Sequence, residues 1–240
     1  DGLVTGVQTC ALPIYGFSAL MWAIYNKSWD SIPLLLATGK GLDLQNVFGE
    51  TALHLAIDYR LFDIATLLVK HNANVLVRDK QLRTPLHLAA EKGDLQNVDL
   101  LIARGASAKV QDAAGDTPLM KSIQNGYAST AASLMNQPQD INMANAQGQT
   151  ALHLAAYGNL PDIALDLMKR NININGRDKQ GVTPLMLAAQ SGSLQVVSLL
   201  SEKGASLNLK NTEGKSALDL ARDHNRYSVV EYLEGNIKKK

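Results

Sequence analysis

The chain reads Thr84-Pro85-Leu86-His87-Leu88-Ala89 at one point, and variants of this stretch return along almost its whole length. They begin at positions 18, 51, 84, 117, 150, 183 and 216, so every step is 33 residues. The other six are Ser18-Ala19-Leu20-Met21, Thr51-Ala52-Leu53-His54, Thr117-Pro118-Leu119-Met120, Thr150-Ala151-Leu152-His153, Thr183-Pro184-Leu185-Met186 and Ser216-Ala217-Leu218-Asp219. Because the period does not slip across six steps, the sequence predicts a repeat protein whose repeats stack on one another.

Each part of the stretch has a local structural role. Thr or Ser stands where a helix needs an N-cap, because its hydroxyl accepts a hydrogen bond from a backbone N–H of the first turn. Proline, as at Pro85, follows at the first helical position, where its missing N–H costs nothing. Glycine or asparagine then ends this helix in a left-handed turn, at Gly93, Gly126, Gly192, Asn159 and Asn225. A second helix with paired apolar residues follows, so each repeat is predicted to be a helix–turn–helix unit.

Three residues depart from this pattern. Lys27 and Arg60 replace the glycine that ends the first helix, and Leu82 replaces a turn glycine that other repeats keep as Gly49 or Gly115. If the left-handed turn is retained, each such residue costs ~1–2 kcal/mol.

The repeated stretch resembles the ankyrin family, whose 33-residue repeat carries a Thr-Pro-Leu-His-x-Ala signature. The resemblance extends from Tyr15 to the C-terminus. It implies an all-α ankyrin-repeat solenoid of seven 33-residue helix–turn–helix units, with β-turn fingertips along one edge. The expected boundaries are 15–45, 46–78, 79–111, 112–144, 145–177, 178–210 and 211–240.

Residues 1–14 are interpreted as a non-native segment. Residues 4–14 match the translation of a common sequencing-library adapter at all eleven positions. A natural leader fits poorly, because there is no initiating Met, basic start or continuous apolar core. The only cysteine, Cys10, falls in this segment, so disulfide and thiolate roles are not expected. The first repeat carries Phe17, Leu20, Trp22 and Ile24 where a solvent-facing end would be polar, which favours further repeats upstream.

The composition is that of a globular protein. The 240 residues carry a net charge of +1, with 46% hydrophobic and 19% charged residues. This balance gives no reason to expect a nucleic-acid partner. No apolar stretch approaches the ~18 residues that span a bilayer. The compartment stays open: the cytoplasm is favoured, and a secreted or periplasmic location is the alternative.

Three histidines, His54, His87 and His153, are the first candidates for metal or catalytic chemistry. Each lies three residues after a capping threonine, where a side chain can reach back to the cap as in a capping box. They belong to different repeats and cannot converge on one ion as ligands a turn apart would. No phosphate-binding loop, serine elbow or HExxH motif occurs. We therefore expect no enzyme, no cofactor and no metal.

The resemblance implies that a protein partner binds the fingertips and the exposed ends of the first helices. The expected contact residues are Tyr25, Phe48, Tyr59, Arg78, Lys80, Arg83, Lys92, Tyr157, Arg177 and Lys179. Tyr and Arg are enriched among interface hot spots, and the basic fingertip Arg78-Asp79-Lys80 returns as Arg177-Asp178-Lys179. These features predict a partner with an acidic, partly apolar surface. The alternative is that they are ordinary solvated residues and that the interface lies on other repeats.

The sequence therefore predicts a monomeric scaffold or adaptor that binds another protein. One alternative is a regulatory or targeting segment of a larger enzyme or channel, with the other domain upstream. Another is a structural spacer without a partner, which the aromatic and arginine fingertips disfavour.

Overall fold

The computed structural model describes residues 15–138 and 140–237. The adapter-like segment 1–14, with Cys10, and Lys238 to Lys240 lie outside the described residues. The described part contains fourteen helices and no β-strand, so the all-α repeat fold predicted from the sequence is confirmed. The helices are α1 (Ala19–Tyr25), α2 (Ser31–Ala37), α3 (Ala52–Asp58), α4 (Phe62–Lys70), α5 (Pro85–Lys92), α6 (Leu95–Ala103), α7 (Pro118–Gln124), α8 (Ala128–Met135), α9 (Ala151–Tyr157), α10 (Pro161–Met168), α11 (Pro184–Ser191), α12 (Leu194–Glu202), α13 (Ala217–Asp223) and α14 (Tyr227–Ile237).

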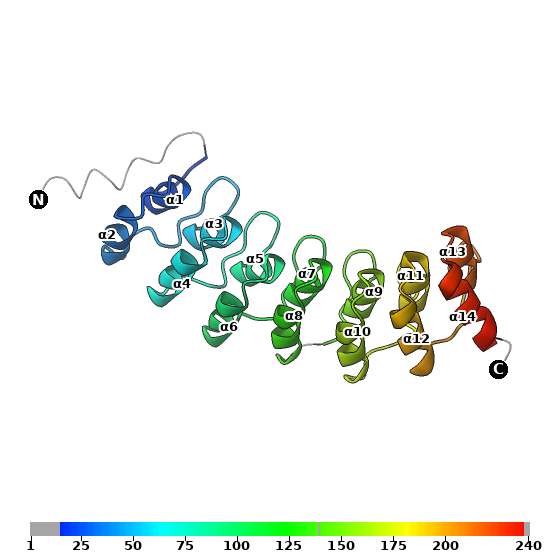
Figure 1. The fold of residues 1–240 in the computed structure, drawn as a ribbon. Coiled ribbons are helices and arrows are strands. Elements are labelled where there is room, and N and C mark those ends of the chain that lie inside the picture. Colours follow the sequence, from blue (N-terminus) through cyan, green and yellow to red (C-terminus); the bar gives the residue numbers. More distant parts are fainter. Residues whose placement is uncertain (1–14, 139, 238–240) are drawn as a thin grey trace, which may run out of the picture. The chain divides into compact units, whose positions relative to one another are not determined.

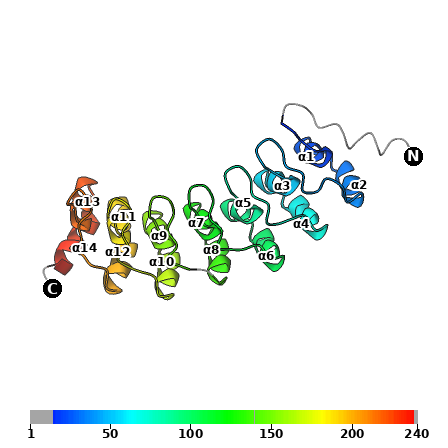
Figure 2. The same ribbon diagram turned by 180° about the vertical axis from the view of Figure 1, so that it is seen from behind.

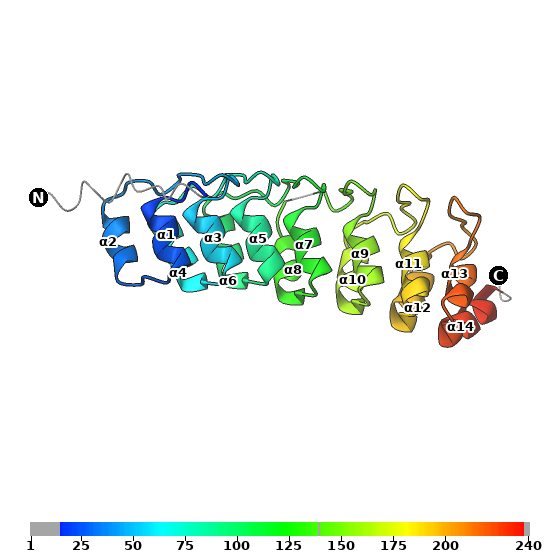
Figure 3. The ribbon, with the colours of Figure 1, turned by 90° about the horizontal axis from the view of Figure 1, so that it is seen from above.

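The chain divides into two compact units, Asp1–Ala113 and Ala114–Lys240, which are called the N-terminal and C-terminal units below. In each unit the helices form consecutive hairpins, such as α1 with α2 and α9 with α10, and each hairpin packs on the next. Within each unit the first helices of the hairpins form one layer and the second helices another, as Figure 1 and the reverse view in Figure 2 show. The loops that join the hairpins of a unit project from the same end of the helices (Figure 3).

The first helix of each hairpin begins at the predicted cap. Ser18, Thr117 and Thr183 each accept a hydrogen bond on the side-chain oxygen from the backbone N–H three residues later. Pro85, Pro118 and Pro184 occupy the first turn. These caps satisfy donors that a helix N-terminus otherwise leaves unpaired, so the repeated stretch fixes where each hairpin starts.

The predicted left-handed turns are also present. Gly93 and Gly192 cap their helices with φ of 72° and 84°, and Asn159 and Asn225 have φ of 51° and 56°. The three departures keep the same geometry: Lys27 and Arg60 have φ of 57° and Leu82 of 59°. The fold therefore retains the turn even where the residue disfavours it.

The core lies between the helix layers of each unit and consists mainly of Leu, Ile, Val and Ala side chains. Alanines such as Ala52, Ala56 and Ala89 are fully buried where the first helices of successive hairpins approach each other. The loops between hairpins, the fingertips, are joined by backbone hydrogen bonds. The N–H of Lys80 donates to the carbonyl of Phe48 at 2.9 Å, and that of Lys179 to Gln147 at 3.0 Å. No helix of the described part is long and apolar enough to cross a membrane.

Candidate partner-binding surface

Six aromatic rings form one continuous cluster in the N-terminal unit. We call it the aromatic surface; its members are Tyr15, Phe17, Trp22, Tyr25, Phe48 and Tyr59. Tyr15 lies between Phe48 and Phe17, with ring centroids 6.1 and 5.9 Å away. Phe17 contacts Tyr25 at 5.8 Å, and Tyr25 contacts Tyr59 at 6.2 Å. Trp22 and Tyr25 stack with their planes 19° apart.

Phe17 is the buried base of the aromatic surface, only 6% exposed. The other five rings are 40–53% exposed. Of the first-repeat residues with internal character, Leu20 and Ile24 are buried like Phe17, whereas Trp22 is 40% exposed. The cluster therefore combines a fixed base with open ring area, which is the usual make-up of an interface anchor.

Three of the ten predicted contact residues, Tyr25, Phe48 and Tyr59, belong to the aromatic surface. The sequence prediction did not include Tyr15, Phe17 and Trp22. A signal for them was present, since eight of the twelve aromatic residues lie between positions 15 and 62. Burial raises the pKa of the Tyr59 hydroxyl, and the nearby carboxylates of Glu50 and Asp58 raise it further. Tyr59 is therefore a neutral hydrogen-bond donor at physiological pH.

The two fingertip arginines bind the protein's own backbone. The Arg78 guanidinium donates to the carbonyl oxygen of Leu82 at 2.9 Å and to that of Gln111 in the next fingertip. In the C-terminal unit, Arg177 donates to the carbonyl oxygen of Lys210 at 2.6 Å. Both arginines thus link consecutive fingertips, a structural role that the sequence prediction did not foresee.

Two further predicted contact residues are paired within the N-terminal unit. Arg83 donates to the buried Asp79 carboxylate at 2.7 Å, and the Lys92 ammonium lies 2.8 Å from Asp58. Both side chains are only partly exposed. By contrast, Lys80 and Lys179 are exposed, and neither ammonium has an ion-pair partner in the part of the chain that the structure describes.

The remaining predicted residue, Tyr157, is 61% exposed in the C-terminal unit. It occupies the same position of the 33-residue period as Tyr25. No ring contact is found for it among the described residues. Tyr157, Arg177 and Lys179 therefore lie in the other unit from the seven remaining predicted residues.

The family model described as "Ankyrin repeats (3 copies)" matches residues 20–112, 86–178 and 166–240. The chain belongs to the ankyrin-repeat family. Ankyrin repeats are generally protein–protein interaction modules and bind other proteins, and the family is typically non-catalytic. A search of curated proteins found no match.

Three of the five histidines in this ankyrin-repeat chain act as structural capping residues, as predicted. His54, His87 and His153 each form a capping box with the preceding threonine. Burial lowers the pKa of His54 to about 4 and also lowers that of His153. The described residues contain no group of three or more metal-ligating side chains.

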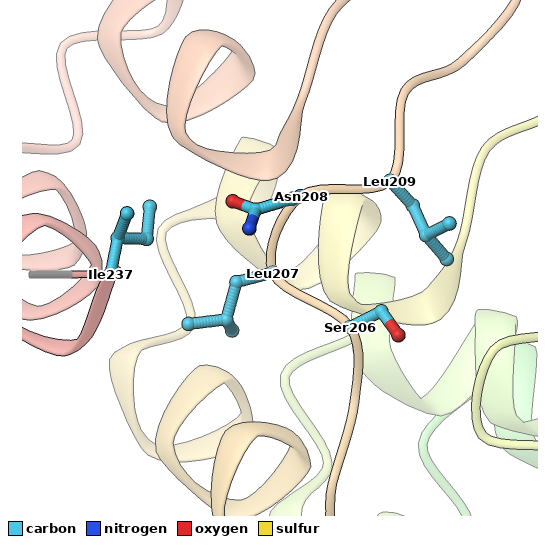
Figure 4. Close-up of a pocket in the computed structure, with 5 residues that line it drawn as sticks. All are labelled: Ser206, Leu207, Asn208, Leu209 and Ile237. Carbon is cyan, nitrogen blue, oxygen red and sulfur yellow. The ribbon is translucent and has the colours of Figure 1, made fainter. Parts of the chain in front are cut away.

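One pocket of about 390 Å³ lies in the C-terminal unit of the ankyrin domain, between the loop after α12 and the end of α14 (Figure 4). Its lining is Ser206, Leu207, Asn208, Leu209 and Ile237. These side chains include no acid or base, and Ser206 has no histidine beside it in this lining. The arrangement provides no activated nucleophile of the kind that hydrolases use.

Proposed function

We propose that this ankyrin-repeat chain is a non-catalytic protein-binding module that holds an acidic, partly apolar partner on its N-terminal unit. The seven proposed repeats between residues 15 and 240 act as the scaffold. The bound surface comprises the aromatic surface and the neighbouring Lys80 ammonium. The module acts as a monomer, and neither a cofactor nor a nucleic acid takes part.

The observation that carries this proposal is the open ring area of the aromatic surface. Tyr25, Phe48 and Tyr59 stand at positions where other repeats carry polar residues. The Tyr25 position holds Gln124 and Gln190, the Phe48 position holds Gln81 and Gln147, and the Tyr59 position holds Asn26 and Asn125. The repeat fold itself therefore does not require rings there. Exposed, rigid aromatic side chains lose little conformational entropy on binding and supply most of the energy at many interfaces.

Lys80 is the residue for which we propose that the partner surface is acidic. Its ammonium is exposed on the fingertip beside Phe48 and has no carboxylate partner among the described residues. Arg78, Arg83 and Lys92 are bound within the protein, so we assign them a supporting role. A charge at the rim of an interface affects association rate and partner choice more than total affinity.

The test is capture of partners from the source organism by the immobilised chain, followed by cross-linking and mass spectrometry. The matched variant carries Tyr25→Gln, Tyr59→Asn and Lys80→Ala, each a residue that another repeat has at that position. We expect this variant to lose the captured protein and to stay folded, with a loss of about 0.5–1.5 kcal/mol for each tyrosine, because ring contacts are removed, and less than about 0.5 kcal/mol for Lys80→Ala. Undiminished capture would falsify the proposal. A Tyr157→Gln variant is the control and should capture normally.

A further inference from the structure

The aromatic surface presents hydrogen-bond donors as well as apolar area. The hydroxyls of Tyr25 and Tyr59 and the indole N–H of Trp22 have no partner among the described residues. Their rings are exposed at the same time. A ligand that combines apolar groups with hydrogen-bond acceptors can contact these rings and accept from these three donors at the same time.

Two uncompensated cations, Lys27 and Lys80, lie beside the aromatic surface at separate places. Lys27 follows Tyr25 by two residues, at the left-handed turn that ends α1, and its exposed side chain has no ion-pair partner within residues 15–138. Lys80 lies beside Phe48. Of the nearby carboxylates, Asp58 is paired with Lys92, whereas Glu50 keeps its negative charge while it accepts a hydrogen bond from the Asn46 amide at 2.8 Å. Charge complementarity therefore favours acidic groups near both ends of the ligand.

The backbone conformation of the ligand can be inferred from the secondary structure around the aromatic surface. The described residues contain no strand whose edge could pair with a partner strand, so strand addition has no template here. A polyproline II segment suits the surface better, because its carbonyl groups are free acceptors and its proline rings are apolar. It is also already extended, so little conformational entropy is lost on binding.

The ring path limits the length of the part of the ligand that contacts the rings, between its acidic ends. From Phe48 through Tyr15, Phe17 and Tyr25 to Tyr59 there are four centroid-to-centroid steps of 5.8–6.2 Å. At ~3.1 Å per residue, about eight residues in polyproline II conformation follow a path of that length at most.

We propose that the aromatic surface binds an extended, proline-rich segment of a partner protein, with acidic residues on both sides of the prolines. This inference rests on the proposed function and specifies the ligand of the same surface. Tyr25, Tyr59 and Trp22 donate to the segment's carbonyl groups, the rings of Phe48 and Tyr15 contact its prolines, and Lys27 and Lys80 pair with its acidic ends.

The test uses the full chain and the fluorescein-labelled peptide Asp-Asp-Pro-Pro-Leu-Pro-Pro-Leu-Glu-Glu, with binding measured by fluorescence anisotropy. We expect saturable binding that is weakened about tenfold or more by Tyr25→Gln or Phe48→Gln, the loss typical of a hot-spot residue. Tyr157→Gln is the matched control, since it makes the same change at the same repeat position without neighbouring rings, and it should leave binding unchanged. Equal weakening by Tyr157→Gln, or no saturable binding by the unaltered chain, overturns the inference.

Two control peptides test the ligand chemistry. A peptide with lysines at both ends should bind at least about tenfold more weakly at low salt, and the difference should shrink as salt rises. A peptide with alanine in place of proline should also bind more weakly, because it must lose more entropy to become extended. Equal binding of either control overturns the corresponding half of the inference.

Sedimentation of the chain without peptide tests whether a second copy occupies the surface. A monomer is expected, and a dimer that Tyr25→Gln dissociates would overturn the inference. The outcome for the proposed function remains separate. If the peptide does not bind but a folded partner is captured in a Tyr25- and Tyr59-dependent way, only the present inference fails.

Discussion

His54 links two consecutive hairpins, because its Nε2 lies 3.4 Å from the carbonyl oxygen of Arg83 in the next fingertip. Its Nδ1 accepts a hydrogen bond from the backbone N–H of Thr51 at 3.2 Å. A ring nitrogen that accepts a hydrogen bond carries no proton, so the proton of the neutral His54 ring is on Nε2. This N–H donates to the backbone carbonyl oxygen of Arg83. His153 repeats the arrangement between Thr150 and Val182 in the C-terminal unit. The neutral imidazole is therefore part of the stacking of the repeats.

The stability of the protein should fall between pH 6.5 and pH 4. Burial lowers the pKa of His54 from 6.5 to about 4, and that of His153 is lowered in the same direction. The unfolded chain therefore binds protons at a higher pH than the folded chain. The stabilisation is complete above the unfolded pKa and is lost as the pH falls toward the folded one. For His54 alone the loss is about 3 kcal/mol between pH 7 and pH 4, to be measured by urea unfolding.

Methionine provides the control for this pH dependence, since Met21, Met120 and Met186 occupy the same repeat position. The Sδ of Met186 even receives the N–H of Thr183 at 3.4 Å, in place of the histidine nitrogen. A chain with His54→Met and His153→Met should lose less stability on acidification than the unaltered chain. Equal losses in the two proteins would show that carboxylates, and not the histidines, are responsible.

Leu82→Gly should stabilise the N-terminal unit by about 0.5–1 kcal/mol. Leu82 has φ of 59°, which costs a non-glycine residue ~1–2 kcal/mol, and part of the gain is offset by the greater freedom of glycine when unfolded.

Gly49→Ala should have the opposite effect and destabilise the N-terminal unit by more than about 1 kcal/mol. Gly49 has φ of 78°, and a Cβ there would lie 2.9 Å from the backbone nitrogen of Lys80. Both tryptophans of the chain, Trp22 and Trp29, lie in this unit, so tryptophan fluorescence in urea measures the two changes. A loss of stability in Leu82→Gly would contradict the strain argument.

Most of the fold could be predicted from the sequence because local chemistry determines it. Thr51 caps a helix through its own hydroxyl, and Asn225 takes a left-handed turn at modest cost, wherever the neighbouring repeats lie. The constant spacing of these signals then gives the order of the hairpins. At Lys27 and Arg60 the sequence left open whether the turn is retained, and their φ of 57° shows that it is.

The candidate site could be predicted only in part, because the two ring contacts that join its repeats, Tyr15 with Phe48 and Tyr25 with Tyr59, link residues 33 and 34 positions apart. Tyr25 and Tyr59 come within 6.2 Å only after their hairpins stack, and nothing local to either residue indicates it. The same holds for Arg78. The sequence around Arg78 suggests an unpaired cation on the fingertip. In the structure, its guanidinium donates to the carbonyl oxygen of Gln111, 33 positions later. A repeat pattern predicts which residues are charged and exposed, but the group that each charged side chain contacts depends on the tertiary structure.

The buried Asn97 and Thr66 should be energetically coupled. Asn97 accepts a hydrogen bond from the Thr66 hydroxyl at 3.0 Å and donates to the carbonyl of Phe62 at 3.0 Å. Asn97→Val, which copies Val196 and Val229, leaves the Thr66 hydroxyl buried without this partner and removes the 2.6 Å hydrogen bond to the buried Asp94 carboxylate, so it should cost about 2–3 kcal/mol. Adding Thr66→Ala removes the stranded hydroxyl, so the double variant should be more stable than the sum of the single changes by about 1 kcal/mol. Additive losses in urea unfolding would mean that the two side chains do not interact.

Arg78 and Lys80, two residues apart on one fingertip, should separate stability from binding. Arg78→Ala removes the hydrogen bonds to Leu82 and Gln111 and should lower the free energy of unfolding by about 0.5–1.5 kcal/mol, a modest cost because the side chain is exposed. Arg78→Lys should not restore it, since an ammonium cannot reproduce the planar fork of donors that spans the two carbonyls. Lys80→Ala, which copies Ala113 and Ala146, should leave stability within about 0.5 kcal/mol and weaken only the binding of an acidic ligand. Tryptophan fluorescence in urea and peptide anisotropy measure the two effects on the same proteins. If Lys80→Ala destabilised the unit as much as Arg78→Ala, Lys80 would be a structural residue and the basic end of the proposed binding surface would have to be placed elsewhere.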